Sequence, residues 1–363
     1  MGSDVREIHG TTGWAQGHRL VTWEGAPAAS GIFAPEELFE VFLTVREDPR
    51  GVGVIFFNYE VEENVFHRQG SAPTPPEHMP SRADATFAGH RERVKSELRG
   101  AHYCLRVTEP QAYSAAIFER LVERFAVLSP ALERESRAIR TTAFVGDYAY
   151  TPFGVHVDPY PQIQCAVSGA RTAFFWDDAY WVGRTEADRM APWKHLQAAH
   201  EVAIPAGNAI YWAGDYEHAF SSGGEGDAAT REGPSIALTV SFPEIPPADS
   251  EVERIRRRSA RHFLNAPLAR AARSFSADHA FSGSALFPVT MTSSNDGEAI
   301  VIGAGRTFTM PCVPGLAALV ARVNERRPFR LRDCEELDEG DARVILELLY
   351  AHYCVDALDA PRR

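Results

Sequence analysis

Between residues 139 and 242 the sequence breaks into short apolar segments separated by turn residues. Each segment is three to seven residues long, which is typical of strands rather than helices. The expected strands are residues 139–145, 155–157, 163–167, 172–176, 202–204, 209–212 and 236–242. A Pro-Ala-Gly-Asn turn at 205–208 separates two of them. Short strands at this spacing predict a closed or double-layered all-β core of the jelly-roll kind.

Helices and further strands are expected before this core. Residues 34–46 and 109–125 carry apolar side chains at spacings of three and four, the pattern of amphipathic helices. The apolar run 53–59 predicts a buried strand, and residues 101–107 predict a second one. Residues 1–30 are expected to be mostly irregular with one short strand at 18–23, while 70–84 and 222–234 have the composition of loops.

After residue 247 the pattern returns to helix. Residues 250–272 are charged and read as helical, 314–324 and 341–353 as amphipathic helices, 331–337 as a short helix and 354–358 as a strand. Three short helices and a strand are similar to a winged-helix module. Four parts are therefore predicted: an N-terminal flanking region (1–100), a barrel (101–247), a helical linker (248–300) and a winged-helix-like domain (301–363).

Charge and cysteine usage narrow the class of protein. The formal net charge of -12 argues against a chain that binds nucleic acid as a whole, and the basic run at 254–261 is expected to be a solvated helix face. Five scattered cysteines without a C-x-x-C pair fit reduced thiols. No apolar run reaches the roughly 18 residues of a membrane span, and the N-terminus lacks the build of a signal peptide. A cytoplasmic protein without a membrane partner is expected.

Three residues point to a metal site. His156 and Asp158 stand two apart in a segment of strand character, so their side chains should share one face. An imidazole and a carboxylate on one face are two of the three ligands of a facial iron(II) site. His218 is the best candidate for the third, because it follows a turn and an apolar strand that could return it to this face. Any H-x-D pair alone is weak in a chain with 13 histidines.

Arg171 strengthens the pattern. It lies 15 residues after His156, at the start of an expected strand. A fixed cation that is partly buried there would need an anion as partner.

These residues resemble the JmjC-type branch of the cupin-fold iron(II) and 2-oxoglutarate oxygenases, and within it the ribosomal-oxygenase-like (cupin 4) group. The matching positions are His156, Asp158 and Tyr160 for H-x-D-x-Y, Gly169-Ala170-Arg171 for Gly-x-Arg, and His218 for the distal histidine. The resemblance implies an α+β chain with a double-stranded β-helix (jelly-roll/cupin) barrel, flanking helices and a C-terminal helical, winged-helix-like domain. The resembling group forms dimers through the segment after the barrel, for which residues 250–272 are the candidate here, and the sequence leaves the oligomeric state open between a monomer and a homodimer.

The resemblance assigns roles to residues. His156, Asp158 and His218 would hold Fe(II), and Arg171 would bind the distal carboxylate of 2-oxoglutarate, with O2 as the second cosubstrate. Tyr148, Tyr150, Thr142, Gln162 and Ser241 are positioned to contact 2-oxoglutarate or to order the iron ligands, and ordinary barrel packing explains each equally well. Of these, Thr142, Tyr150 and Gln162 are selected as cosubstrate-binding residues.

The expected reaction is hydroxylation of an unactivated C–H bond in a peptide, protein or amino-acid-like substrate, with release of succinate and CO2. The carboxylate of Asp158 favours hydroxylation, because related halogenases replace it with a small residue. Two other readings remain open: a cupin metalloenzyme that uses its metal as a Lewis acid for isomerisation or hydrolysis, and a non-catalytic binding barrel. Nucleic acid is not an expected partner.

Overall fold

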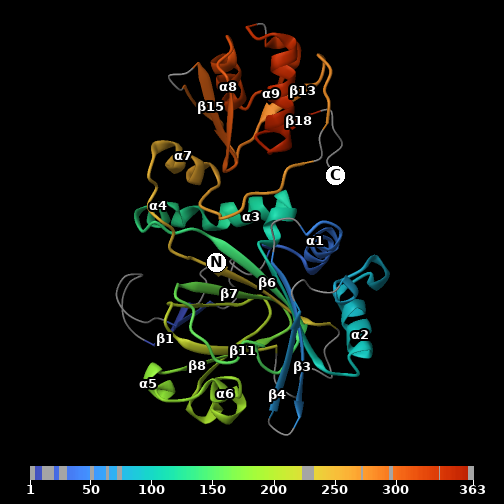
Figure 1. Cartoon of the computed structure of the whole chain (residues 1–363), viewed down its shortest axis with the longest axis vertical. Helices are drawn as coiled ribbons and strands as arrows, with labels where there is room; N and C mark the ends of the chain where they lie inside the picture. Colours follow the sequence, from blue (N-terminus) through green and yellow to red (C-terminus); the bar gives the residue numbers. More distant parts are fainter. Residues whose placement is uncertain are drawn as a thin grey trace. The chain divides into compact units, whose positions relative to one another are not determined.

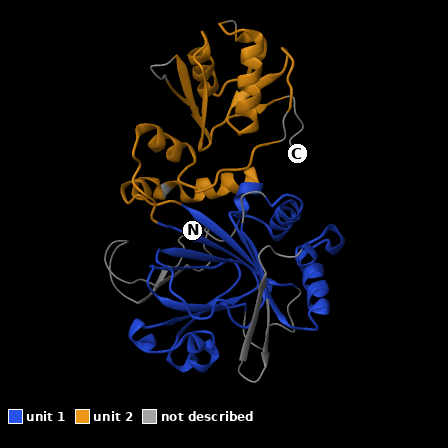
Figure 2. Cartoon of the chain, viewed as in Figure 1, with its two compact units in different colours: residues 1–113, 139–243 blue, residues 114–138, 244–363 orange. Residues whose placement is uncertain are grey.

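The structure is a computed structural model that describes residues 5–9, 20–23, 31–49, 53–62, 65–71, 76–222, 233–270, 273–293, 297–334 and 336–358. The chain divides into two compact units, shown in blue and orange in Figure 2. The barrel unit comprises Met1–Tyr113 and Ile139–Pro243. The C-terminal unit comprises Ser114–Ala138 and Glu244–Arg363. The barrel unit carries every residue of the predicted site.

The barrel unit contains two antiparallel sheets (Figure 1). The larger has the order β1-β2-β10-β7-β12-β6-β5-β3-β4, and the smaller has the order β11-β8-β9. Its strands are β1 (Val5–His9), β2 (Leu20–Trp23), β3 (Val54–Glu62), β4 (Val65–Ser71), β5 (His102–Thr108), β6 (Arg140–Asp147), β7 (Gln162–Ser168), β8 (Arg171–Trp176), β9 (His200–Ile204), β10 (Ala209–Trp212), β11 (Glu217–Ser221) and β12 (Ser235–Ser241). From β7 to β12 the chain crosses repeatedly between the sheets, which is the jelly-roll pattern and confirms the predicted fold class.

Most predicted strands are present within a few residues of their expected ends. The segment 155–157 differs, because it forms a single bridge between His156 and His218 instead of a strand. Residues 1–100 were expected to flank the barrel. Their strands β1 to β4 instead belong to the larger sheet itself. In that sheet β6 pairs with β5 on one side and with β12 on the other, so the backbone groups of β6 are satisfied on both sides.

The barrel interior is apolar on one side and polar on the other. Apolar side chains from β7 to β11 form one buried cluster: Ala166, Ala173, Phe175, Val202, Ile204, Ile210, Trp212 and Phe220. The face of the larger sheet formed by β5, β6, β7 and β12 instead carries threonine, glutamine, serine and arginine side chains. A polar interior surface in a jelly roll is where a ligand site is expected.

Helices cover the barrel unit from outside: α1 (Pro35–Glu47), α2 (Phe87–Glu97), α5 (Asp178–Trp181) and α6 (Glu186–Arg189). The helix predicted at 34–46 corresponds to α1, whereas α2 was not predicted. The ring of Phe87 in α2 meets those of Phe39 and Phe42 in α1 edge-on, with centroids 5.2 and 5.4 Å apart. Thr86 begins α2 by accepting a hydrogen bond from the Gly89 backbone.

The helix predicted at 109–125 is divided in two. Residues Pro110–Tyr113 form a 3-10 turn, and α3 (Ala115–Phe125) begins at Ser114, whose hydroxyl accepts from the Ile117 backbone N–H. The backbone of Glu109 has a φ of 56°, which no α-helix tolerates. The unit boundary falls at this break.

The C-terminal unit combines helices with two three-stranded antiparallel sheets, β14-β15-β16 and β17-β13-β18. Its elements are α3, α4 (Ser129–Arg134), α7 (Glu251–Ser259), β13 (Ala280–Gly283), β14 (Thr290–Ser293), β15 (Glu298–Gly303), β16 (Arg306–Pro311), α8 (Leu316–Glu325), β17 (Phe329–Arg330), α9 (Glu339–Ala351) and β18 (Val355–Ala357). The two long predicted helices and the final strand are present as α8, α9 and β18. The short helix predicted at 331–337 is a 3-10 turn, Leu331–Asp333.

The helix predicted at 250–272 ends early. In the structure α7 stops at Ser259, because Arg261 and His262 have φ values of 53° and 64°. The predicted loop at 222–234 lies outside the described residues except at its two ends, and 72–75 of the predicted loop 70–84 lie outside them as well. Across the described chain, no helix has the length and apolar character that crossing a membrane requires.

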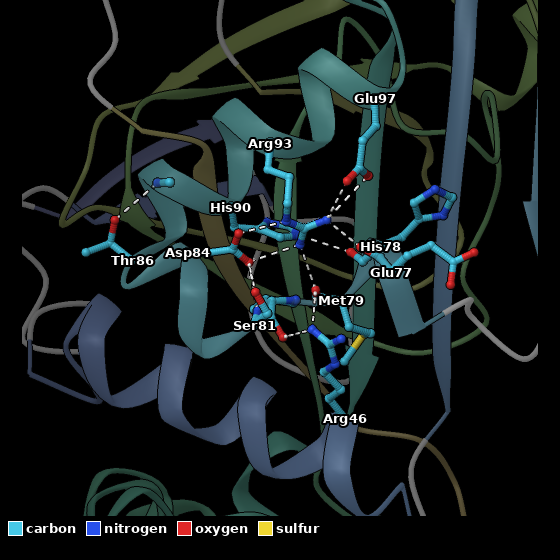
Figure 3. A network of polar contacts seen from close by, with 12 residues as sticks. Arg46, Glu77, His78, Met79, Ser81, Asp84, Thr86, His90, Arg93 and Glu97 are labelled. Carbon is cyan, nitrogen blue, oxygen red and sulfur yellow. Dashed lines mark hydrogen bonds and ion pairs between the residues drawn. The ribbon is translucent and has the colours of Figure 1, made fainter.

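The part of the predicted loop 70–84 that follows residue 75 is held firmly by a charged network (Figure 3). Arg93 of α2 grips the Asp84 carboxylate through two hydrogen bonds of 2.7 and 3.0 Å, and it also donates to the Met79 carbonyl at 3.0 Å. Ser81 donates to Asp84 through its backbone N–H and its hydroxyl. From α1, Arg46 donates to the Pro80 carbonyl at 3.2 Å. The network ties this segment to both helices.

Asp84→Asn is expected to lower the free energy of unfolding by roughly 2 kcal/mol at pH 7. Burial alone raises the pKa of Asp84, but Arg93 and Ser81 outweigh it and lower the pKa to about 2. The stabilisation is therefore complete above pH 4 and is lost as the pH falls toward 2. Urea unfolding at pH 7 and pH 3 checks this, since the difference between variant and wild type should shrink at pH 3. Glu97→Gln, which removes the more exposed partner of Arg93, should cost about 0.5 kcal/mol or less.

Candidate metal centre

Two histidines are brought together by a direct backbone pair. The His156 N–H donates to the His218 carbonyl at 3.1 Å, and the His218 N–H donates to the His156 carbonyl at 2.9 Å. Residues that exchange both hydrogen bonds across an antiparallel pair project their side chains from the same face. The two imidazole centroids consequently lie 4.4 Å apart. The pairing sets both rings side by side without a regular strand at 155–157.

Asp158 completes the cluster from two residues further along. Its Oδ2 lies 3.4 Å from Nε2 of His218 and 3.8 Å from Nε2 of His156. One ligand atom from each of the three residues lies within 4.8 Å of the others. Within the described ranges this is the one group of three or more His, Cys, Asp or Glu side chains with that spacing.

Hydrogen bonds fix the tautomer of both rings. Nδ1 of His156 lies 3.1 Å from the Gly154 carbonyl, and Nδ1 of His218 lies 2.8 Å from the Tyr216 carbonyl. A carbonyl can only accept, so each Nδ1 carries a proton, and the neutral form of each ring keeps the lone pair of Nε2 for the cluster. Burial, reinforced by the neighbouring His218, lowers the pKa of His156 to about 4 and keeps this ring neutral. Neutral imidazole is the form that binds a metal.

Asp158 is oriented by the larger sheet. The side-chain amide of Gln162 donates to Asp158 Oδ2, and the Ser241 hydroxyl donates to Gln162 Oε1 at 3.1 Å. Burial alone raises the pKa of Asp158, but the two neighbouring histidines and the hydrogen bond from Gln162 lower it on balance, so the carboxylate is ionised. Gly214 packs against the Asp158 segment so closely that a Cβ there would lie 2.6 Å from the Tyr160 backbone nitrogen.

The cluster opens into a cavity of about 180 Å³ with a polar floor. Strand register places Arg140, Ser241 and Gln162 in one row across β6, β12 and β7, and Thr142, Thr239 and Gln164 in the next. Within the second row, the Gln164 amide donates to the Thr239 hydroxyl at 3.1 Å. Buried Gln164 Oε1 and Trp212 Nε1 have no hydrogen-bond partner among the described residues. Orphaned polar atoms around a cavity indicate a polar ligand.

Arg171 lies on the wall of the same cavity and is 1% exposed. Its guanidinium donates to the Tyr148 hydroxyl through Nη2 and lies 3.5 Å from the Ser235 hydroxyl through Nη1. No carboxylate in the described part of the chain forms an ion pair with it, and its Nε has no partner there. A buried cation without a counter-charge is strongly unfavourable, so this end of the cavity is suited to an anion.

The structure brings most of the predicted site residues together. His156, Asp158, His218, Arg171, Thr142 and Gln162 all line the cavity. Tyr150 does not, because its ring packs against Phe174 and Trp193 with centroids 5.9 and 6.0 Å away. Tyr148, considered but not selected, is the tyrosine that contacts Arg171. The chain leaves β6 at Asp147, so strand alternation could not decide between the two tyrosines.

Other lining residues were missed by the sequence reading: Arg106, Arg140, Gln164 and Thr239. A usable signal existed in the alternation of polar residues along β7 and β12, where Gln162 and Gln164, and Thr239 and Ser241, stand two apart.

Comparisons with known proteins are as follows. No family model and no curated protein matches the sequence. Solved structures of YcfD, a ribosomal oxygenase from Escherichia coli, are similar, with a TM-score of 0.45, 11% identity, and 94% of each chain covered. One of them is a complex with cobalt and 2-oxoglutarate, matched at the same score and identity over 93% of this chain and 94% of that chain. Ribosomal oxygenases, the group that the sequence was expected to resemble, are therefore among the solved structures similar to this chain.

A more distant match is oxalate decarboxylase from Bacillus subtilis, with a TM-score of 0.22, 11% identity, and 43% of this chain and 29% of that chain covered. At identities this low, the function of this chain has to be inferred from its own residues and not from these matches.

Asp158→Ala is expected to abolish binding of Co(II) or Mn(II), because it removes the only anionic ligand of the cluster. Gln162→Leu should lower the affinity for the same metals by about 10- to 100-fold, because the ligand carboxylate of Asp158 loses the hydrogen bond that orients it. Isothermal titration of the metal-free protein measures both effects.

Gln164→Leu is the matched control, because Gln164 lies on the same strand and face but does not contact a ligand residue. Metal affinity that falls equally in the Gln162 and Gln164 variants would show that Asp158 does not depend on Gln162.

Proposed function

We propose that this chain is an Fe(II)- and 2-oxoglutarate-dependent oxygenase that hydroxylates an unactivated C–H bond of a peptide, protein or amino-acid-derived substrate. The proposal rests on two features that occur together in one cavity, a set of metal ligands and a buried cation. A facial set of two imidazoles and one carboxylate shares that cavity with a buried arginine that lacks a carboxylate partner in the described chain.

The donor set fits iron(II). Two histidines and one carboxylate on one face leave several coordination positions open, as non-haem iron oxygenases require. When bound, the iron supplies the oxidation chemistry, in which one oxygen atom of O2 enters the substrate hydroxyl and the other enters succinate as CO2 leaves. His156, His218 and Asp158 enter this site preorganised, because hydrogen bonds from or to the protein orient each of them.

Arg171 supports 2-oxoglutarate as the cosubstrate. Its planar guanidinium can bind a carboxylate through two parallel hydrogen bonds, and the Tyr148 hydroxyl holds it in place. Thr142, Thr239 and Gln164 line the floor of the cavity and offer hydroxyl and amide groups to a polar ligand. A dicarboxylic acid that reaches from the metal ligands to Arg171 would satisfy both charged ends of this cavity.

The same arginine separates this proposal from the alternatives. A metalloenzyme using its metal only as a Lewis acid has no need of a buried cation in the cavity, and a non-catalytic barrel has no need of histidines held in the metal-binding tautomer. A cytoplasmic location, a homodimer through 250–272, the winged-helix-like domain and the four-part domain division stay predictions.

Turnover of 2-oxoglutarate to succinate by the full chain with Fe(II) and O2 is the direct test. Binding of 2-oxoglutarate is measured beside turnover, so the test needs no substrate identity. A chain that neither binds 2-oxoglutarate nor forms succinate would contradict the proposal.

Arg171→Gln should raise the dissociation constant for 2-oxoglutarate at least 30-fold, because a desolvated charge pair contributes about 2 kcal/mol or more. Metal affinity should stay within about twofold, since Arg171 does not contact the ligands. Titration of the Mn(II)-loaded protein without oxygen measures the first quantity, and titration of the apoprotein measures the second. If the affinity for the metal fell as much as the affinity for 2-oxoglutarate, Arg171 would have a structural role only.

Tyr148→Phe and Tyr150→Phe form a matched pair that tests which tyrosine serves the cosubstrate. Removing the Tyr148 hydroxyl releases Arg171 from a hydrogen bond, and the dissociation constant for 2-oxoglutarate should rise about 3- to 10-fold. The Tyr150 variant should bind as the wild type does, because that ring lies outside the cavity lining. The reverse order would restore Tyr150 as the cosubstrate residue.

A further inference from the structure

Two more arginines line the cavity, and the proposed reaction gives neither a role. Arg106 lies on β5, opposite Phe144 of β6, and Arg140 begins β6. Arg140, Thr142 and Phe144 alternate along β6 and all line the cavity, so Arg106 and Arg140 share the face that carries the polar floor.

Arg106 lines the same cavity as the metal ligands, and an aromatic ring lies between it and His156. Its guanidinium carbon is 5.9 Å from the centroid of the Phe153 ring, which in turn lies 5.5 Å from the His156 ring. In the described part of the chain no ion pair or hydrogen bond satisfies its side chain, and its Nε is shielded from solvent without an acceptor. A shielded guanidinium nitrogen without an acceptor indicates that a ligand supplies one.

Arg140 is only weakly neutralised. Its partner is Glu109, whose carboxylate oxygen lies 3.9 Å from Arg140 Nε. Burial raises the pKa of Glu109 to about 7, so this carboxyl is only partly ionised near neutral pH. Arg140 is half exposed, which leaves it free to meet a group that enters the cavity.

The charge balance of the cavity points the same way. Its lining holds three arginines and one carboxylate, Asp158. A divalent metal adds two positive charges, and 2-oxoglutarate adds two negative ones that belong to the metal and Arg171. The lining keeps a surplus of positive charge next to the reacting position. Such a surplus attracts anions and repels cations, most strongly where water is partly excluded.

We propose that the substrate is an amino acid or peptide that bears a carboxylate and that Arg106, with Arg140 nearby, binds this carboxylate and so positions the C–H bond at the metal. The proposal rests on the proposed function and specifies its substrate class. Arg106 is a substrate-binding residue in this scheme, and Arg171 remains the cosubstrate residue.

The test uses the full chain loaded with Mn(II) and saturating 2-oxoglutarate in the absence of oxygen. Four probes are titrated at equal ionic strength: N-acetyl-aspartate methylamide, N-acetyl-alanine, N-acetyl-asparagine methylamide and N-acetyl-arginine methylamide. The first carries only a side-chain carboxylate and the second only a terminal one, so they distinguish the two sources. The third is the neutral isostere, and the fourth is cationic.

At least one carboxylate probe should bind tenfold or more tightly than the neutral isostere, and the cationic probe should bind most weakly. Arg106→Gln should weaken the preferred carboxylate probe by about 10- to 100-fold, while Arg106→Lys keeps part of the affinity. Both variants should keep the wild-type affinity for 2-oxoglutarate and Mn(II). Arg184→Gln, an exposed position outside the cavity lining, controls for the change in net charge.

Three results would overturn the inference. One is a neutral or cationic probe that binds as tightly as the carboxylates, and another is the failure of every carboxylate probe to bind at 10 mM. The third is an Arg106→Gln variant whose affinity for 2-oxoglutarate falls as well, which would show that Arg106 binds the cosubstrate. Failure of the proposed function is distinct, because the wild type would then not bind 2-oxoglutarate at all.

Discussion

The candidate site depends on one backbone interaction, the reciprocal hydrogen bonds between His156 and His218. Residues 151–158 form no regular strand, yet they carry two of the three ligands. The pair with His218 attaches this segment to β11, and the Thr151 N–H adds a bond of 2.6 Å to the Phe220 carbonyl. Because residues opposite each other in such a pair share a face, the attachment sets both imidazoles on one face. Asp158 lies two residues after His156, so in an extended chain its side chain projects to the same face as that of His156.

A second layer of contacts fixes the strand that receives this segment. Glu217, next to His218, is nearly buried and accepts a hydrogen bond of 2.6 Å from Arg189 of α6. The carbonyl of the same Arg189 accepts from the Val155 N–H at 2.8 Å. Arg189, in the segment between β8 and β9, therefore contacts the neighbours of both histidine ligands, Val155 beside His156 and Glu217 beside His218. A partly buried ion pair is weak evidence for stability but good evidence for a defined position.

Sequence reasoning succeeded where local pattern and tertiary environment agree. The helices α1, α8 and α9 were predicted because their apolar side chains repeat with the helical period, and the strands β6, β7, β8, β10 and β12 because they are short apolar runs between turn residues. It failed where a short polar segment owes its structure to neighbours. The helix α2 has few apolar residues and is held by the charged network around Arg93 and Asp84, and β11 is recognisable only by its pairing with β8.

By itself the sequence determined the chemical types available for the site: a histidine and a carboxylate two apart, a second histidine, and an arginine at the start of a strand. It also determined that short strands would dominate residues 139–242. Tertiary structure alone decided which tyrosine contacts Arg171 and which arginines line the cavity. Residues from β5, β6, β7 and β12 meet in one cavity only after the strands pair across the fold, and no local pattern records the register that aligns them.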